Sequence, residues 1–364
     1  HDWIGKLNLE YTLRPDHALN LNLYGTGTWQ QPHNELMDRS LGYPANFDSR
    51  LTALTTGLSY EAFFFNRRLQ TAVTAKHFLI GSRAKMLHNF YLRDIKTIHI
   101  NRSEWGANFA ACYRITPLWT VKGSVASEVR IPTSEELLGN SFNILPSPDL
   151  LPERNKSVNA GVLYRRPFSD DRVWEAEVNV YMSELTDMVR FTPDLLPTMA
   201  RYTNFGQVRT MGIEAEIKAD VTRWCYLYAN GTWQDLRDRR RTFPNSKAPN
   251  PTYDLRIPNI PYLMANFGGE LHWADLFGRG QNTRLLLDAS YVHRYSYDFE
   301  MGAYLEKLIP TSLTFDAAIE QSFANRRWTL TLKVKNLADR ETVSEFNRPL
   351  PGRTCSVKLR YLLR

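Results

Sequence analysis

Apolar and polar residues alternate in several long segments of this chain. From Ile213 to Lys218, every second residue is apolar and the residues between them are charged. The same period of two runs through residues 6–13, 174–182 and 313–320. Successive side chains of a β-strand point to opposite faces, so each segment predicts a strand with one apolar face and one polar face.

The length of these segments favours a membrane protein over a soluble sandwich. Strands of soluble proteins are usually about five or six residues long, whereas tilted strands that span a bilayer need roughly nine to eleven. The alternating segments lie in stretches of about ten to fourteen residues between turn-like connections, such as 210–219 and 172–184, which fits the longer value. No apolar run approaches the roughly 20 residues that a membrane-spanning helix requires, so helical spans are excluded. The pattern predicts a transmembrane β-barrel.

The connections between the segments are of two kinds. Short ones lie at residues 14–17, 66–68, 116–117, 166–171, 220–222, 275–281 and 324–326. Long ones lie at about 30–50, 80–100, 130–155, 185–209, 236–260, 296–310 and 337–351. Outer-membrane barrels have short turns on the periplasmic side and long loops outside, which assigns the orientation of each strand.

Fifteen membrane-spanning strands follow from this division. We expect them at 4–13, 18–29, 51–65, 69–79, 102–115, 118–129, 157–165, 172–184, 210–219, 223–235, 261–274, 282–295, 311–323, 327–336 and 353–364. The first of them runs inward from the outer surface. Bacterial single-chain barrels have an even strand number and begin at the periplasm, so we expect further strands upstream of residue 1.

Composition is consistent with this fold. Aromatic residues make up 12% of the chain, and many lie near the ends of predicted strands, where they would form the two aromatic girdles of a barrel. They are Trp29, Phe64, Tyr113, Trp119, Tyr164, Trp174, Trp233, Trp273, Trp328 and Tyr361. The three cysteines, Cys112, Cys225 and Cys355, are far apart and have no metal-ligand spacing, so they are read as packing residues.

The formal net charge of +7 raises the question of an anionic partner. The densest basic cluster is Arg237 with Arg239 to Arg241, in a long connection rich in proline. It lacks the interleaved aromatic residues and recognition helix of nucleic-acid-binding folds, so we expect no nucleic acid partner. A loop that faces the anionic lipopolysaccharide of the outer membrane, or an anionic ligand, accounts for these arginines at least as well as a nucleic acid does.

Four motifs occur between residue 129 and the C-terminus. They read VRIPTSEELLG with PSPDLLPER at 129–154, NFGQVRTMGIE at 204–214, RIPNIPY at 256–262, and VKNLADR with PGR at 334–353. In this order they resemble motifs of TonB-dependent outer-membrane receptors. Each also has a local physical reading: Pro258 and Pro261 suit a strand start, and Asn336 and Asp339 suit a strand exit. We therefore interpret the motifs as architecture of the barrel rim rather than as ligand contacts.

The resemblance implies a function and a missing part. Such receptors import a scarce nutrient, here a siderophore, cobalamin, or a glycan or peptide ligand, and the TonB complex pulls on a plug inside the barrel. We expect an all-β, antiparallel barrel domain over residues 1–364, part of a 22-stranded barrel, with the N-terminal plug and first strands absent from the chain. The alternative is a passive pore or structural barrel without a plug. The ending Tyr361 to Arg364 departs from the aromatic terminus usual in the family.

Neither a cofactor nor a metal nor an enzymatic activity is expected. No nucleophile elbow, zinc-protease or phosphate-loop motif appears in a supporting context. Haem uptake is disfavoured because the stretch from Arg130 to Glu153 holds no histidine. Arginine forks suit carboxylate, catecholate or phosphate groups, which makes the basic residues of the long connections the candidate ligand-binding set. These candidates are Arg130, Arg154, Arg201, Tyr202, Arg237, Arg239, Arg240 and Arg241.

The predicted orientation can be tested by labelling. In a cysteine-free background, single cysteines at Phe142 or Asn245 should react with a membrane-impermeant maleimide on intact cells, because long connections face outward. A cysteine at Asn325, in a short turn, should be protected. Labelling at Asn325 with protection at Asn245 would show that the orientation is the opposite of the predicted one.

Overall fold

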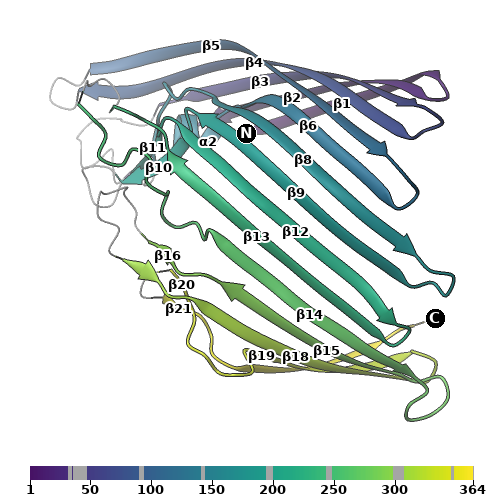
Figure 1. Cartoon of the computed structure of the whole chain (residues 1–364). Coiled ribbons are helices and arrows are strands. Elements are labelled where there is room, and N and C mark those ends of the chain that lie inside the picture. The colour runs from purple at the N-terminus through teal and green to yellow at the C-terminus, as the bar shows by residue number, and fades with distance from the viewer. Residues whose placement is uncertain are drawn as a thin grey trace.

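The computed structural model describes the chain except for residues 32–34, 36–46, 90–93, 141–143, 194–199, 243–247, 298–306, 346–347 and 364. Its main element is one sheet of 15 strands in which each strand pairs antiparallel with the next along the chain. In Figure 1 these strands lie side by side in a tilted, strongly curved wall. Within the described residues, no helix has the length and apolar character needed to cross a membrane.

The strands of the wall are long. They are β1 (Asp2–Arg14), β2 (His17–Gln30), β3 (Ser49–Phe64), β4 (Leu69–Asn89), β5 (Asp94–Arg114), β6 (Trp119–Arg130), β8 (Glu153–Pro167), β9 (Val173–Thr186), β12 (Val208–Thr222), β13 (Cys225–Asp238), β14 (Leu263–Ala274), β15 (Asn282–Val292), β18 (Ser312–Phe323), β19 (Trp328–Lys335) and β22 (Thr354–Tyr361). The predicted number of wall strands is confirmed.

Smaller elements lie in the long connections. They are α2 (Ser134–Leu138), β7 (Ile144–Leu145), β10 (Val189–Pro193), β11 (Ala200–Asn204), β16 (Tyr295–Ser296), β17 (Leu308–Ile309), β20 (Val343–Glu345) and β21 (Arg348–Pro349). The short turns are tight. Between β18 and β19, Ala324, Asn325 and Arg326 all take positive φ, between 48° and 67°, which reverses the chain within three residues.

The predicted long loop at about 80–100 is wrong for most of its length. β4 and β5 continue as a paired hairpin, with His99 opposite Arg83 and Thr97 opposite Lys85. This part of β5 is rich in β-branched residues, with Ile95, Thr97, Ile98 and Ile100, and such residues favour strands. The hairpin is therefore longer than a bilayer requires, and its far end lies beyond the membrane. Of the labelling sites, Phe142 and Asn245 lie outside the described residues.

The two faces of the wall differ as the alternation predicts. Val178, Val180 and Met182 of β9 are 48%, 46% and 42% exposed on the outer face. Between them, Glu177 and Asn179 point to the inner face, where Glu177 accepts a hydrogen bond from Asn179 at 2.6 Å and pairs with Lys122. An apolar outer face and an ion-paired inner face suit lipid outside and water inside.

Most of the predicted girdle residues are exposed on the wall, at 38% to 51%. They are Trp29, Phe64, Tyr113, Trp119, Trp174, Trp233, Trp328 and Tyr361. The others, Tyr164 and Trp273, are half-buried, and the ring of Tyr164 contacts that of Trp119, with 4.8 Å between centroids. Trp3 and Trp105 are also exposed on the wall, although the sequence analysis did not assign them to a girdle.

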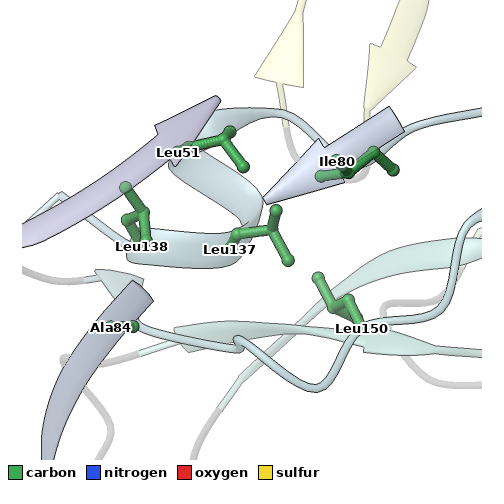
Figure 2. Close-up of a cluster of buried hydrophobic side chains, with 6 residues drawn as sticks. All are labelled: Leu51, Ile80, Ala84, Leu137, Leu138 and Leu150. Carbon is green, nitrogen blue, oxygen red and sulfur yellow. The ribbon is translucent and has the colours of Figure 1, made fainter. Parts of the chain in front are cut away.

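The connection from β6 to β8 folds against the inner face of the wall. Helix α2 opens with a capping box, in which Thr133 and Glu136 each accept a hydrogen bond from the other's backbone N–H. Its Leu137 and Leu138 are 4% exposed, and they belong to a buried apolar cluster completed by Leu150 and by wall residues of β3 and β4. Figure 2 shows the six side chains, the wall members being Leu51, Ile80 and Ala84.

Strands β1 and β22 form the two edges of the sheet, since β1 pairs with β2 and β22 pairs with β19. Every residue of both strands is exposed. The expectation of upstream strands and a plug stays a prediction.

The assignment of faces can be tested on β9. Val178→Arg should destabilise the assembled barrel by about 2–4 kcal/mol, because it places a charge against hydrocarbon near the midplane. Asn179→Arg is the matched control, since its side chain would enter the inner face beside Glu177. Heat-modifiability on gels should show early unfolding for the first variant and little change for the second. Equal losses would contradict the assigned faces.

Candidate ligand-binding surface at the outer loops

Two of the long connections join into one layer at the end of the wall that we assign to the outside. Strands β10 and β11, which lie between β9 and β12, form an antiparallel pair. The start of β11 then pairs in parallel with β7, which lies between β6 and β8, so that Ala200 is opposite Ile144. In Figure 1, β10, β11 and α2 lie together at this end of the wall. Backbone hydrogen bonds thus fix the two connections relative to each other.

Asn204 is a second link between these connections. Its side-chain oxygen accepts from the backbone N–H of Leu151 at 2.8 Å, and its amide nitrogen donates to the Leu151 carbonyl at 3.0 Å and to the Asp187 carbonyl at 2.7 Å. Asn204 opens the NFG motif and Leu151 lies in the PDLLPE motif. The two motifs are therefore in direct contact, and this contact is architectural, as the sequence analysis inferred.

Arg130 ties the start and the end of the β6–β8 connection together. Its guanidinium donates to both carboxylate oxygens of Glu153, at 2.7 and 2.8 Å, and also to Glu136 at 2.9 Å. Glu153 accepts a further hydrogen bond from the backbone N–H of Val189, at 2.7 Å. A bidentate arginine–carboxylate pair is strong and directional. The N–H groups of the Arg130 guanidinium are therefore engaged by two of the protein's own carboxylates, those of Glu136 and Glu153.

Asp238, the last residue of β13, is fully buried and organises the connection that follows. Its carboxylate accepts from the guanidinium of Arg240 at 2.6 Å, from the Thr252 hydroxyl at 2.7 Å and from the Asn250 amide at 2.9 Å. Burial alone would raise the pKa of the Asp238 carboxyl, but these donors outweigh burial and hold its pKa below the usual value. The guanidinium of Arg240 also lies 3.7 Å from the ring centroid of Phe205.

Arg237 and Arg239 are also engaged. Arg237 lies within β13 rather than in the loop that the sequence analysis expected, and it donates to Asp235 at 2.6 Å and to the Asp254 carbonyl at 3.0 Å. Arg239 pairs with Asp254. Asp235 is 6% exposed and receives a second guanidinium, that of Arg256, at 2.6 Å. The basic cluster is thus interleaved with carboxylates, which lowers its net charge.

The remaining candidates differ in environment. Arg154 pairs with Glu104, whereas Arg201 and Arg241 have exposed side chains. Tyr202 packs against the α2 cluster, and its ring lies 5.2 Å from that of Phe191. Burial, followed by the charges of Glu135 and Glu136, raises the pKa of the Tyr202 phenol, so the phenol stays protonated at neutral pH.

Five of the eight candidates have a carboxylate partner in the structure. They are Arg130, Arg154, Arg237, Arg239 and Arg240. Of the others, Arg201 and Arg241 have exposed side chains, and Tyr202 packs against the α2 cluster. The partner residues Glu136, Glu153 and Asp238 were not singled out from the sequence. Only Glu136 had a readable local signal, the Thr133-x-x-Glu136 capping box. In the described part of the chain, no group of three or more histidine, cysteine, aspartate or glutamate residues could hold a metal ion.

Comparison with known protein families decides the identity of this barrel. The model of the family described as TonB dependent receptor-like, beta-barrel matches residues 1–337. The chain belongs to this family. Its wall is the barrel portion of a TonB-dependent receptor and lies in the outer membrane. The comparison with curated proteins finds no match.

Solved structures with the same fold include a copper transporter, OprC, with a TM-score of 0.72 and 15% identity over 98% of this chain and 56% of the other. The FrpB iron transporter of Neisseria meningitidis has a TM-score of 0.71 and 12% identity over 97% and 54%. The ferric yersiniabactin uptake receptor FyuA of Yersinia pestis has a TM-score of 0.65 and 16% identity over 98% and 52%. The chain spans about half the length of these structures.

The buried carboxylate after β13 gives a testable prediction. Asp238→Ala leaves the Arg240 guanidinium, the Thr252 hydroxyl and the Asn250 amide without their shared acceptor. Breaking one partner of a buried pair costs about 3–5 kcal/mol, so the connection should open locally while the wall stays assembled. Hydrogen exchange should show faster exchange of the backbone N–H groups of Arg240 and Asn250, with exchange in β9 unchanged.

The depressed pKa of Asp238 also predicts how the stability of this connection changes with pH. Because the folded pKa of Asp238 is depressed, its contribution is present above the unfolded value of about 3.9 and is lost as the pH falls through the folded value. Protection of the Arg240 and Asn250 N–H groups should therefore persist at mildly acidic pH and decline only below about 3.9. Loss of protection near neutral pH would contradict the assigned charge state.

Proposed function

We propose that this chain forms the barrel of a receptor that takes up a scarce nutrient across the outer membrane with energy from the TonB complex. Membership of the receptor family is the observation that carries the proposal. Energy would reach the barrel through a plug domain encoded upstream of residue 1. The family and the structural relatives are receptors and transporters, and none of those described above is an enzyme.

The inner face of the wall supports passage of a polar solute. Ion pairs line it, among them Lys122 with Glu177, and Arg284 with Glu270 at 2.6 Å. A hollow of about 540 Å³ opens between β4, β5, β6, β8, β9 and β12, where Ala72, Ala110 and Gly161 leave room. Charged side chains in such a surface are stable only in contact with water or with a polar occupant.

The ligand class that we favour is an iron chelate, a siderophore complex among them. The support is indirect: structural relatives include the iron transporter FrpB, the receptor FyuA for ferric yersiniabactin and the ferric citrate transporter FecA. Cobalamin and a glycan or peptide ligand remain the other members of the proposed class. The exposed arginines Arg201 and Arg241 suit the carboxylate or catecholate groups of a chelate.

A passive pore or structural barrel is the second candidate, favoured by the ion-paired, water-compatible inner face alone. The two functions differ in their need for energy. We expect uptake of radiolabelled ferric citrate or of a ferric catecholate by cells that carry the complete receptor to stop when TonB is deleted. Uptake that continues without TonB, at a rate proportional to solute concentration, would support the pore instead.

The binding residues can be tested separately from the energy requirement. In the complete receptor, Arg201→Ser with Arg241→Ser should weaken binding of the transported chelate by about tenfold or more, as expected for lost charge-assisted hydrogen bonds. Arg326→Ser with Arg327→Ser, in the β18–β19 turn at the opposite end, is the matched control. Replacing Arg239 or Arg240 is less informative, because each supports the fold of its connection. Unchanged affinity in the first variant would remove Arg201 and Arg241 from the site.

A further inference from the structure

A row of basic side chains crosses three strands near the outer end of the wall. Arg50 of β3 is directly opposite Arg83 of β4, and Arg83 is directly opposite His99 of β5. Lys85 lies two residues beyond Arg83, on the same face of β4. The side chains of Arg50, Arg83 and His99 are exposed.

This row lies on the outer, lipid-facing side. Its strand neighbours Leu51 and Ala84 are buried under α2 on the inner face, at 7% and 1% exposure. Because side chains of a strand alternate between faces, Arg50 and Arg83 must point the other way. Figure 2 shows Leu51, Ile80 and Ala84 gathered around α2 on that inner side.

Arg50 and Arg83 place two positive charges side by side in this row. Residues directly opposite each other on one face of a sheet have Cβ atoms about 5 Å apart, and like charges there are destabilising. Within the described part of the chain, neither Arg50 nor Arg83 forms an ion pair, in contrast to the arginines of the outer loops. Two adjacent guanidinium groups with no carboxylate form a site for an anion, and phosphate matches their fork geometry.

A groove of about 590 Å³ lies directly below the row on the same face. The polar residues Thr52 and Asn101 lie next to the row, on either side of Gly81. Leu54 and Leu79 lie two residues further down, level with Ser103, and Trp3 borders the groove from β1. Gly81 forms part of the floor; a Cβ at this position would lie 3.1 Å from the Thr52 hydroxyl and 3.4 Å from the Asn101 side-chain oxygen. The absence of a side chain at Gly81 keeps the groove open.

The height of the groove fits the outer boundary of the hydrocarbon. Trp29 is directly opposite Arg50, at the level of the row, and its side chain is 51% exposed. Aromatic rings with a polar edge lie where hydrocarbon meets headgroups. The basic row is therefore level with the headgroups, and the apolar end of the groove is level with the acyl chains.

We propose that Arg50, Arg83 and His99, with the groove below them, bind a phosphorylated glycolipid of the outer leaflet, the lipid A part of lipopolysaccharide. The phosphate lies between the two guanidinium groups, the sugar hydroxyls contact Thr52 and Asn101, and an acyl chain follows Leu54 and Leu79 beside Trp3. This site is on the outer wall and separate from the loops that face the transported nutrient.

The test uses the complete receptor in detergent, with native mass spectrometry to measure binding of bisphosphorylated lipid A and of its dephosphorylated form. The unmodified receptor should prefer the phosphorylated lipid. Arg50→Ser with Arg83→Ser and His99→Ser should lower that affinity by about tenfold or more, in line with the loss of charge-assisted hydrogen bonds, and should abolish the preference. Arg326→Ser with Arg327→Ser, at the other end of the wall, should bind as the unmodified receptor does.

A second variant separates the groove from the charge. Gly81→Leu keeps every basic residue but fills the groove, so it should reduce binding of both lipid forms, and it carries the test if the triple variant fails to assemble. Excess inorganic phosphate should not displace lipid A, because the groove holds the acyl part. Equal binding of the two lipids by the unmodified receptor, unchanged binding in either variant, or displacement by inorganic phosphate would overturn the proposal.

Discussion

Backbone N–H and C=O groups cannot remain unpaired in hydrocarbon, and this requirement shapes the whole wall. The continuous antiparallel pairing from β1 to β22 meets that requirement for the interior strands. It also fixes the register, and with it which side chains meet lipid and which meet water. The ion pairs of the inner face, such as Lys122 with Glu177, are stable because the register keeps both members on the wet side.

Charge pairing serves a different purpose above the membrane. Arg130 holds the two ends of the β6–β8 connection through Glu136 and Glu153, and Asp238 gathers three donors from the connection after β13. Long connections lose much conformational entropy on ordering, and directional charge-assisted hydrogen bonds offset that loss. The consequence is that Arg130, Arg154, Arg237, Arg239 and Arg240, five of the eight candidate residues, stabilise the fold of the connections.

Arginines on the outer wall are in the opposite situation. Within the described residues, Arg50 and Arg83 lie side by side without a carboxylate partner, at the level of the exposed Trp29. Basic residues there complement the anionic outer leaflet rather than the transported nutrient. The positive net charge of the chain is thus divided between internal pairing in the loops and attraction to lipid at the wall.

The barrel fold, the number of wall strands, the short turns and the outward face of residues such as Val178 could be predicted from the sequence, because a period of two is a local property that each strand carries alone. The sequence did not predict the length of the β4–β5 hairpin, in which paired strands replace an expected loop. Nor could the sequence predict which arginines form ion pairs. Arg130 pairs with Glu153, and Arg50 lies opposite Arg83, only because the register aligns distant segments. Such pairings depend on the tertiary structure, since spacing along the chain says nothing of which side chains face each other across strands.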